Sequence, residues 1–452
     1  MDKYLELSSK YDTFIYDSYR IYEEDNKLKI SYHYIIQNLE DFNTTLEIDK
    51  KDIKNKHIDN NLLSYLAFHI GMVELLSYYK AVCSKNIIVN CGYLSKAQID
   101  WFKKLYYNGL GEFFYVNNIK VDSRFVNIKT SQKKLTFSNN YNGFGNLITI
   151  GGGKDSIVAC EILRSLYEEN TCFSLNPKSA HMASIKSLGY EEKKIIVHKT
   201  YIDKKLIELN KKGFLNGHTP FSSLLAFISY LTAYLTGRKY IVLSNEASAN
   251  ESTVLGTNIN HQYSKTYEFE CDFNSYTKKY FNIDIKYFSL LRCLTELQIA
   301  FLFSKYKKYH LVFKSCNVGS KSVPWTWCCK CAKCLFVYII LSPFLYKDDL
   351  VKIFKTDLYE DKSLLNTFIE LIGYSDKKPF ECVGTYNEAR YAISLTIRSL
   401  NGKLPFLLEY YKNHYPLYFN DHIIDDINEK NNIDDKFMKI VKEELENARR
   451  NI

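Results

Sequence analysis

Three consecutive glycines, followed by a lysine, an aspartate and a serine, are the first residues whose types and spacing could do chemistry. Gly151, Gly152 and Gly153 stand between an apolar, strand-like run and a helix-like stretch. Glycines at such a junction let backbone N–H groups wrap a phosphate, and the positive end of the following helix favours that anion. Lys154 would add a mobile charge, and Ser156 a hydroxyl donor, to the same oxygens. We expect a nucleotide phosphate site; the alternative is a turn that only packs a strand against a helix.

Two common phosphate loops are excluded by the spacing. A Walker loop needs a glycine where Ile148 stands and a serine or threonine where Asp155 stands. The dinucleotide fingerprint needs a third glycine where Ser156 stands. What remains has the form of the pyrophosphate loop of the adenine-nucleotide alpha-hydrolase-like ATPases. That form implies that ATP is split into AMP and pyrophosphate, with AMP transferred to an oxygen of the acceptor and with Lys154 and Asp155 as catalytic residues.

Polar residues end two further strand-like segments, "CFSLNP" and "VLSNEASANE". Ligands lie at the carboxyl edge of parallel sheets, so we expect these residues in the same pocket as the glycine loop. The acidic residues of the second segment could hold Mg²⁺, which prefers carboxylate, water and phosphate ligands. A solvated loop with a helix cap is the alternative for each of them. The predicted residues for binding ATP and Mg²⁺ are Gly151, Gly152, Gly153, Lys154, Asp155, Ser156, Ser174, Asn176, Asn245, Glu246 and Glu251.

A second constellation, "WCCKCAKC", places cysteines at the spacing of a metal site. Cys328, Cys331 and Cys334 follow a Cys-x-x-Cys-x-x-Cys pattern, and Cys316 lies upstream. Four thiolates suit one tetrahedral Zn²⁺ and leave no open position, which predicts a structural site. Catalytic or metal-free thiols are the alternative. Cys329 is left over, as another ligand or a free thiol.

The elements that must position these residues change character along the chain. In the first 145 residues, two strand segments surround a polar turn within residues 27–48, a helical stretch covers 61–81, and Ser95 leads a helix after the strand "KNIIVN". From Asn146, strands at 146–150, 171–176, 193–198, 239–248 and 310–318 alternate with helices, the pattern of a parallel sheet covered on both faces.

The predicted fold class is therefore α/β, with a parallel doubly wound sheet of the pyrophosphate-loop type. We expect an N-terminal α+β domain over 1–145, an ATP-binding domain with the cysteine cluster over 146–345, and a helical region over 346–452.

Composition limits the partners and the compartment. With 452 residues, 46% hydrophobic and 25% charged, the chain can form two or three domains. Its net charge of +9 is spread among acidic residues, which fits a small anionic substrate and shows no basic, aromatic surface for nucleic acid. The apolar stretches from Phe221 and Cys334 fall short of the roughly 20 residues that span a bilayer. We expect a cytoplasmic protein without a membrane partner, whose twelve cysteines form no disulfide framework.

The loop and the cysteine cluster together resemble 7-cyano-7-deazaguanine synthase. Nearly the whole chain is more similar to the family of UDP-N-acetyl-α-D-muramoyl-L-alanyl-L-glutamate epimerases. The blocks that carry this resemblance are "GLGEFFYVNNI", "GGGKDS", "NGHTPFSSLLAF", "LSNEASANESTV", "NHQYSKTYEFE", "WCCKCAKC" and "PFECVGTYNEAR". The resemblance implies a cytoplasmic enzyme of peptidoglycan precursor synthesis. It would use ATP and Mg²⁺ to convert the terminal L-Glu of the UDP-muramoyl dipeptide to D-Glu.

The chemistry agrees with that activity, because an α-proton beside a free carboxylate is very weakly acidic, whereas an acyl-AMP lets a positioned base remove it. The base is not fixed by the sequence. The candidates are His218, His261, Tyr263, Lys265 and the pair Cys328 and Cys329, of which we take His261 as the predicted catalytic residue.

Two other function classes remain open at this point. One is another adenylating pyrophosphate-loop enzyme, such as a deazaguanine synthase-like or tRNA-modifying enzyme. The other is a nucleotide-binding module without catalysis, against which the intact Lys154, Asp155 and Ser156 count.

Overall fold

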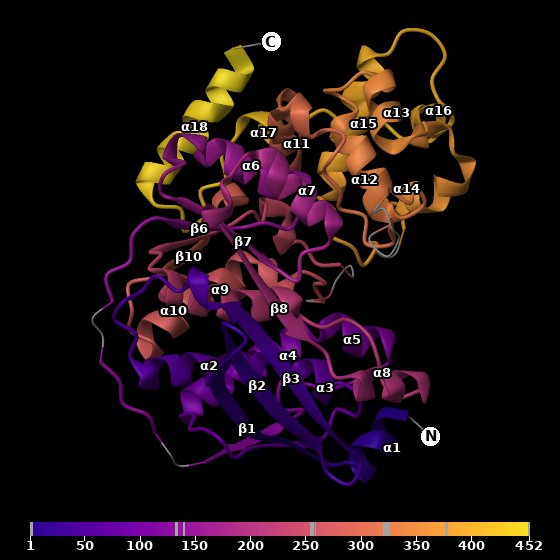
Figure 1. Ribbon diagram of the computed structural model, residues 1–452. Coiled ribbons are helices and arrows are strands. Elements are labelled where there is room, and N and C mark those ends of the chain that lie inside the picture. The colour runs from indigo at the N-terminus through magenta and orange to yellow at the C-terminus, as the bar shows by residue number, and fades with distance from the viewer. Residues whose placement is uncertain are drawn as a thin grey trace.

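Ten strands of the described chain form one mixed sheet. In Figure 1 its labelled strands run from β6 and β10 in the middle of the molecule to β1 in the lower part. The computed structural model describes residues 3–131, 134–138, 141–253, 257, 259–319, 326–375 and 378–450. The strand order is β10-β9-β6-β7-β8-β3-β2-β1-β4-β5. The strands are β1 Thr13–Glu24, β2 Lys27–Ile36, β3 Glu40–Asp49, β4 Asn86–Val89, β5 Asn127–Thr130, β6 Asn146–Thr149, β7 Asn170–Leu175, β8 Ile195–Tyr201, β9 Tyr240–Leu243 and β10 Lys286–Ser289.

The half of the sheet from β10 to β8 is parallel throughout. Counted from β6, its order is 3-2-1-4-5, which is that of a doubly wound sheet whose direction of winding reverses between β6 and β9. The antiparallel pairing of β3 with β8 joins this half to the N-terminal strands. The α/β class is thus confirmed, and the sheet as a whole is mixed. The domain boundaries at 145 and 345 stay predictions. Strands from before and after residue 145 pair with one another in the same sheet.

Helices cover both faces of the parallel half and make up the C-terminal part of the chain. They are α1 Lys3–Lys10, α2 Asn60–Glu74, α3 Leu76–Tyr79, α4 Lys96–Gly109, α5 Gly111–Val116, α6 Lys154–Ile162, α7 Ser179–Leu188, α8 Lys204–Lys211, α9 Phe221–Thr236, α10 Tyr267–Tyr280, α11 Glu296–Lys305, α12 Ala332–Leu341, α13 Lys347–Phe354, α14 Leu365–Leu371, α15 Tyr386–Ser399, α16 Phe406–His414, α17 His422–Asp425 and α18 Asp435–Arg450. Ser95 caps α4 as the sequence predicts, in a reciprocal pair with Gln98.

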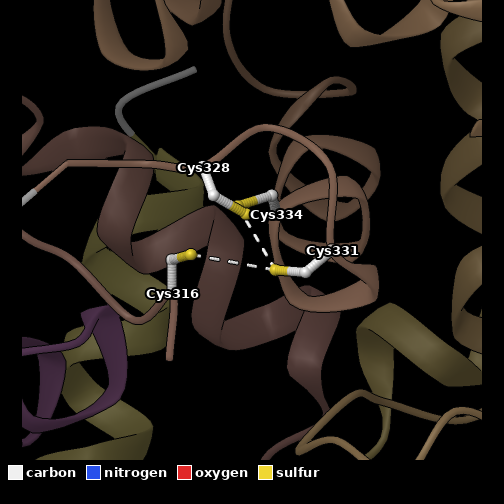
Figure 2. A group of neighbouring side chains, drawn as sticks. All are labelled: Cys316, Cys328, Cys331 and Cys334. Atoms are coloured by element: carbon white, nitrogen blue, oxygen red, sulfur yellow. Dashed lines mark hydrogen bonds between the residues drawn. The ribbon is translucent and has the colours of Figure 1, made fainter. Parts of the chain in front are cut away.

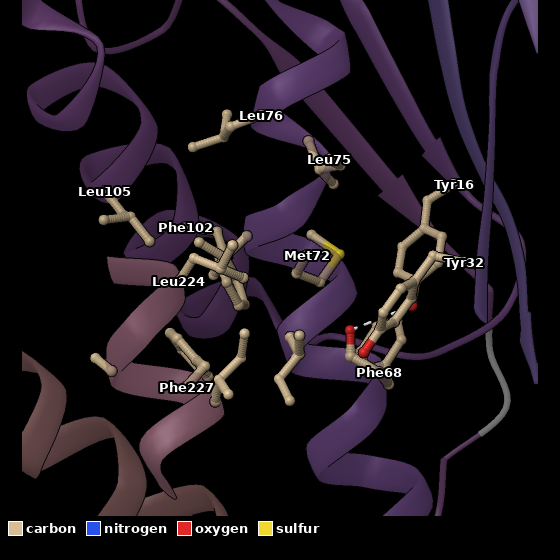
Figure 3. Packing of buried hydrophobic residues seen from close by; sticks show 14 of the residues in the cluster. Tyr16, Tyr32, Phe68, Met72, Leu75, Leu76, Phe102, Leu105, Leu224 and Phe227 are labelled. Carbon is tan, nitrogen blue, oxygen red and sulfur yellow. Dashed lines mark hydrogen bonds between the residues drawn. The ribbon is translucent and has the colours of Figure 1, made fainter. Parts of the chain in front are cut away.

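The two hydrophobic cores lie on opposite faces of the sheet, because successive strand residues point to opposite sides. Leu147 belongs to the first core, which also contains residues of the N-terminal unit, α9 and α10. Its neighbour Ile148 belongs to the second core, which contains residues of α6, α11 and the C-terminal helices. Figure 3 shows part of the first core, where Phe68 of α2 stacks on Tyr16 of β1, and Phe227 of α9 packs against Phe102 of α4.

Within the part of the chain that the structure describes, one helical stretch, Asn60–Tyr79, is long and apolar enough to cross a membrane. Its apolar window is 83% buried inside the molecule, so it is a core helix. The apolar stretches predicted as buried helices are α9 and α12.

One predicted strand is wrong. Residues 310–318 form turns and irregular chain, with the N–H groups of Val312 and Phe313 donating to the carbonyl of Tyr309. The side chain of Phe313 is buried against Phe303 and Trp327, so its apolar character serves packing. The sheet edge is occupied by β10, a short segment that the sequence pattern did not reveal.

Candidate active site

The glycine loop lies at the carboxyl end of β6, beside the switch point of the sheet. Gly152 has a φ of +77°, and a Cβ there would lie 2.7 Å from Cδ2 of His181, so the position requires glycine. A Cβ on Gly151 would meet no described heavy atom within 4 Å. Gly153 caps α6 without a side chain, and Ser156 donates its hydroxyl to the Gly153 carbonyl at 3.1 Å. The loop therefore presents helix N–H groups on an open side.

Lys154 is buried between two carboxylates. Its side chain is 2% exposed, and its Nζ donates to Asp155 and to Glu296, which begins α11. Burial raises the pKa of Glu296 to about 8. Burial would also raise the pKa of Asp155, but the positive charge of Lys154 has the larger effect and lowers it. Oε1 of Glu296 has no hydrogen-bond partner among the described residues. A buried, unsatisfied oxygen beside a phosphate loop is suited to a ligand.

The predicted residues after β7, Ser174 and Asn176, hydrogen-bond to neighbouring strands at the carboxyl edge of the sheet. Ser174 donates its hydroxyl to the carbonyl of Ile150 at 3.1 Å. Asn176 donates to Oγ1 of Thr200 at 2.7 Å and accepts from its N–H at 2.8 Å. These bonds hold the ends of β6, β7 and β8 together, and contact of Ser174 and Asn176 with ATP stays a prediction.

The predicted residues after β9 lie closer to the charged groups of the site. Asn245 donates to the hydroxyl of Ser289 at 3.1 Å. Glu246 is buried and near enough to Glu296 to contribute to its raised pKa. Glu251 accepts from Lys378, a buried lysine of the C-terminal part.

A buried arginine fixes the loops that follow β9 and β10. Arg292 has no exposed side-chain surface. It donates to the carbonyls of Glu246, at 2.7 Å, and of Lys265, and it pairs with Glu270 at 3.3 Å. The segment with Glu246 is thus held against the segment with Lys265.

Lysines gather around these carboxylates. Lys154, Lys333 and Lys378 are buried, and Lys265 is half-buried. Lys265 and Lys333 both lie close enough to Asp155 to lower the pKa of that carboxyl. Lys154 and Lys378 have carboxylate partners, whereas Nζ of Lys265 and of Lys333 has no carboxylate within salt-bridge distance among the described residues. Buried lysines are rare unless paired, so these two charges favour an anionic ligand. Sequence reasoning missed Lys333, although its position inside the cysteine motif was a usable signal.

A thiol, two imidazoles and a carboxylate form a row beside the lysines, which we call the thiol–imidazole row. It consists of Cys382, His261, Glu112 and His218. Lys265 donates to Sγ of Cys382 at 3.1 Å, and Cys382 also hydrogen-bonds to His261. His261 contacts the carboxylate of Glu112 on α5, and Nδ1 of His218 lies 3.4 Å from the same carboxylate. The structure thus brings two predicted candidates, His261 and Lys265, onto a cysteine that the sequence analysis did not single out.

The charges in this row follow from its contacts. Burial alone would raise the pKa of Cys382, but Lys265 and His261 lower it to about 6. Burial would lower the pKa of His261, but Cys382 and Glu112 raise it to about 9. Burial lowers the pKa of His218 to about 4. Near neutral pH the row holds a thiolate between two cations, with a neutral imidazole beyond them.

The other predicted base candidates are engaged elsewhere. Burial raises the pKa of Tyr263 to about 12, and its hydroxyl hydrogen-bonds to Asn108. Cys329 donates to the carbonyl of Phe354 at 3.1 Å. Cys328 lies with the other cysteines of its motif.

The four predicted zinc ligands converge, as Figure 2 shows. Their sulfur atoms all lie within 4.8 Å of one another, with separations of 3.8 Å for Cys316 and Cys331, 3.7 Å for Cys328 and Cys334, and 3.6 Å for Cys331 and Cys334. Thiolates bound tetrahedrally at the usual Zn–S distance are about 3.8 Å apart. The residues therefore fit a Zn²⁺ ion.

A groove of about 980 Å³ opens beside the thiol–imidazole row. Its lining includes Gly111, the neighbour of Glu112, and Ile259, two residues before His261. Tyr115 in the same lining packs on Phe380, with ring centroids 5.6 Å apart. The groove thus reaches the segment that carries Cys382.

The fold and the site define an α/β protein whose ionisable side chains gather at the switch point of a doubly wound sheet, as in an enzyme active site. Residues 6–290 match the family described as the MurL N-terminal domain, and residues 312–414 match the MurL C-terminal domain. The chain belongs to the MurL family.

Three named relatives extend this similarity. A UDP-N-acetyl-alpha-D-muramoyl-L-alanyl-L-glutamate epimerase of Xanthomonas oryzae pv. oryzae is 34% identical over 333 residues, which cover 72% of this chain and 73% of the relative. Proteins of the same name from a Micromonospora species and from Salinispora tropica are 34% and 33% identical, each over 72% of this chain and over 73% and 72% of the relative. No solved structure matches the chain.

Proposed function

We propose that this protein is a cytoplasmic epimerase that converts the terminal L-Glu of UDP-N-acetylmuramoyl-L-Ala-L-Glu to D-Glu, using ATP and Mg²⁺. Membership of the MurL family and the names of the relatives support the reaction. The observation that carries the mechanism is the position of the thiol–imidazole row next to the phosphate loop. Lys265 lies between them, because its Nζ contacts Cys382 and its charge lowers the pKa of Asp155. Activation by a nucleotide and proton transfer can therefore occur in one site.

The first step is adenylation of the glutamate carboxylate. A carboxylate oxygen attacks the α-phosphorus of ATP, and the bond to pyrophosphate breaks. The N–H groups at the start of α6 bind the phosphates, and Lys265 and Lys333 offset their charge. Asp155 and the unpartnered oxygen of Glu296 would hold Mg²⁺, which neutralises charge on the leaving pyrophosphate.

Adenylation explains why an epimerase would use ATP. Removing the α-proton beside a free carboxylate would place two negative charges on one enediolate. The acyl-AMP has no charge on its acyl group, so the electron pair of the C–H bond can enter its carbonyl. Return of a proton to the opposite face inverts the carbon, and hydrolysis of the acyl-AMP releases the D-Glu product with AMP.

The cysteine cluster has a supporting role in this proposal. Cys316, Cys328, Cys331 and Cys334 would hold a structural Zn²⁺, which supplies a rigid link between two loops. Cys331 caps α12, and Lys333 in the first turn of that helix reaches the carbonyl of Cys382. The cluster thus orients a lysine of the site.

The groove beside α5 offers room for the rest of the substrate. It lies next to Glu112 and opens to solvent, whereas the charged row is half-buried. We assign it to the UDP-muramoyl part, which places the terminal glutamate toward Cys382.

Incubation of the purified protein with ATP, Mg²⁺ and the UDP-muramoyl dipeptide tests the proposal. Chiral analysis should find D-Glu at the terminal position, with AMP and pyrophosphate formed together. Omitting ATP is the matched control and should leave L-Glu unchanged. Formation of ADP and phosphate as the stoichiometric products, or of no D-Glu, would overturn it.

A further inference from the structure

Cys382 lies among three cations of the described site. Nζ of Lys265 lies 3.1 Å from its Sγ, His261 hydrogen-bonds to it, and Nζ of Lys333 contacts its carbonyl oxygen. Positive neighbours favour the thiolate, which is the nucleophilic and basic form of cysteine. The side chain is half-buried, so it is sheltered without being sealed from a substrate.

The chain around Cys382 is fixed on both sides. Glu381 accepts from the N–H of Lys333 at 3.1 Å, and Lys378 pairs with Glu251. Gly384 passes so close to the core that a Cβ there would lie 2.6 Å from Cζ of Phe336. These contacts hold the thiolate in one place, as a proton acceptor requires.

The groups beside Cys382 are in the wrong charge state to accept a proton. Lys265 is an ammonium, because Cys382, Glu246 and Asp155 together outweigh its burial and raise its pKa. His261 is an imidazolium, held so by Cys382 and Glu112. Both donate hydrogen bonds, and the thiolate is the acceptor that they share.

We propose that the thiolate of Cys382 is the base that removes the α-proton of the activated glutamate, a role that rests on the proposed function. The Cα–H bond breaks as an S–H bond forms, and the C–H electron pair moves into the carbonyl of the acyl-AMP to give an enolate. The enolate electron pair then takes a proton from an acid on the opposite face to form the new Cα–H bond, and that acid regains a proton from water. The thiol returns its proton to water, which restores the thiolate. Lys265 and His261 are positioning residues that keep the sulfur ionised.

Two steps must be measured separately to test this role. Exchange of labelled pyrophosphate into ATP, in the presence of the UDP-muramoyl dipeptide, reports adenylation alone. Deuterium uptake at the glutamate α-carbon in D₂O, together with D-Glu formation, reports proton transfer. Both assays use the full-length protein, and the variants are Cys382→Ala and Cys382→Ser.

We expect both variants to lose deuterium uptake and D-Glu formation on the order of 10³-fold, the range set by removal of a general base, while pyrophosphate exchange continues. Continued exchange also shows that the variants fold. Cys271→Ser is the matched control, because this half-buried thiol lies on α10 and contacts Asn432. It should leave both assays at the wild-type level.

The outcomes separate the two proposals. Undiminished deuterium uptake in Cys382→Ala, or equal loss of pyrophosphate exchange and deuterium uptake, contradicts the role of Cys382 as the base. Wild-type protein that turns over the dipeptide without pyrophosphate exchange overturns the adenylation on which that role rests.

Discussion

At the scale of single residues, burial decides which charges the site can use. Lys154 has almost no exposed side-chain surface, so its charge persists because Asp155 and Glu296 accompany it. The sequence predicts that Lys154 and Asp155 lie in the phosphate loop, since both follow the three glycines directly. It does not reveal Glu296, which comes from a helix 142 positions further along the chain.

We predict that Lys154→Ala abolishes epimerisation and also lowers the free energy of unfolding by about 3 kcal/mol, because the carboxyl groups of Asp155 and Glu296 lose the buried cation that they share. Urea unfolding of the purified variant gives the second value. Asp155→Asn is the comparison: it should be equally inactive but lose less stability, since the contact between Lys154 and Glu296 remains. An active Lys154→Ala variant would show that the loop is only structural.

The pH dependence of epimerisation should report the charge states of Cys382 and His261. The pKa of Cys382 is lowered to about 6, so the thiolate and the rate increase as the pH rises through that value. The pKa of His261 is raised to about 9, so its positive charge persists through neutral pH, and the rate should stay level from about pH 7 up to that value.

Lys265→Gln gives the matching test of cause. Lys265 contributes the largest of the charges that lower the pKa of Cys382. Without it, this pKa should rise by about 1 to 2 units, and the acidic limb of the rate profile should move to higher pH by the same amount. A limb that stays near pH 6 in this variant would mean that another group controls it. The profile is measured as kcat/KM, which reports the free enzyme.

At the scale of elements, the cysteine motif shows what spacing can and cannot predict. Cys331 caps α12 and Cys334 lies in its first turn, so their closeness follows from the three-residue spacing, and Cys328 precedes them by the same interval in the Cys-x-x-Cys pattern of a metal site. The place of Lys333 between two of them points it toward Glu381 and Cys382, contacts across 48 and 49 positions that no local pattern reveals.

We predict one zinc ion per chain, lost in Cys331→Ser and retained in Cys329→Ser, whose thiol bonds to Phe354 instead. Metal analysis of reduced protein after dialysis measures this directly. Cys331→Ser should also lower the rate of epimerisation, because the first turn of α12 no longer holds Lys333 in place. Equal zinc content in the two variants, or none in the wild type, would remove the site.

At the scale of the whole molecule, the active site joins parts that the sequence presents as separate. The alternation of strands and helices predicts four strands of the parallel half, β6 to β9, since these are short apolar runs with turn signals, but it does not predict β10 at the edge. The pairing of β3 with β8 is not predictable from either strand, because it depends on how the two halves meet. The same meeting brings Glu112 of the N-terminal unit to His261, 149 positions away.

Distance along the chain is also the reason that the sequence did not single out Cys382. It stands alone in its stretch, with no histidine or lysine at a telling spacing, and Lys265 lies 117 positions before it. A lone cysteine has no recognisable chemistry until the fold supplies its cations. The residues of the phosphate loop, by contrast, are contiguous in the chain, so the loop could be predicted from the sequence.

The central claim is that adenylation must precede removal of the α-proton, and deuterium uptake in D₂O tests it most directly. The UDP-muramoyl dipeptide is incubated with the protein and Mg²⁺, with and without ATP, and deuterium is located by mass spectrometry and NMR. With ATP, we predict deuterium at the α-carbon of the terminal glutamate as the D form appears, and none at the alanine α-carbon. Without ATP, we predict no exchange at either carbon. Deuterium entering the glutamate in the absence of ATP would contradict the account.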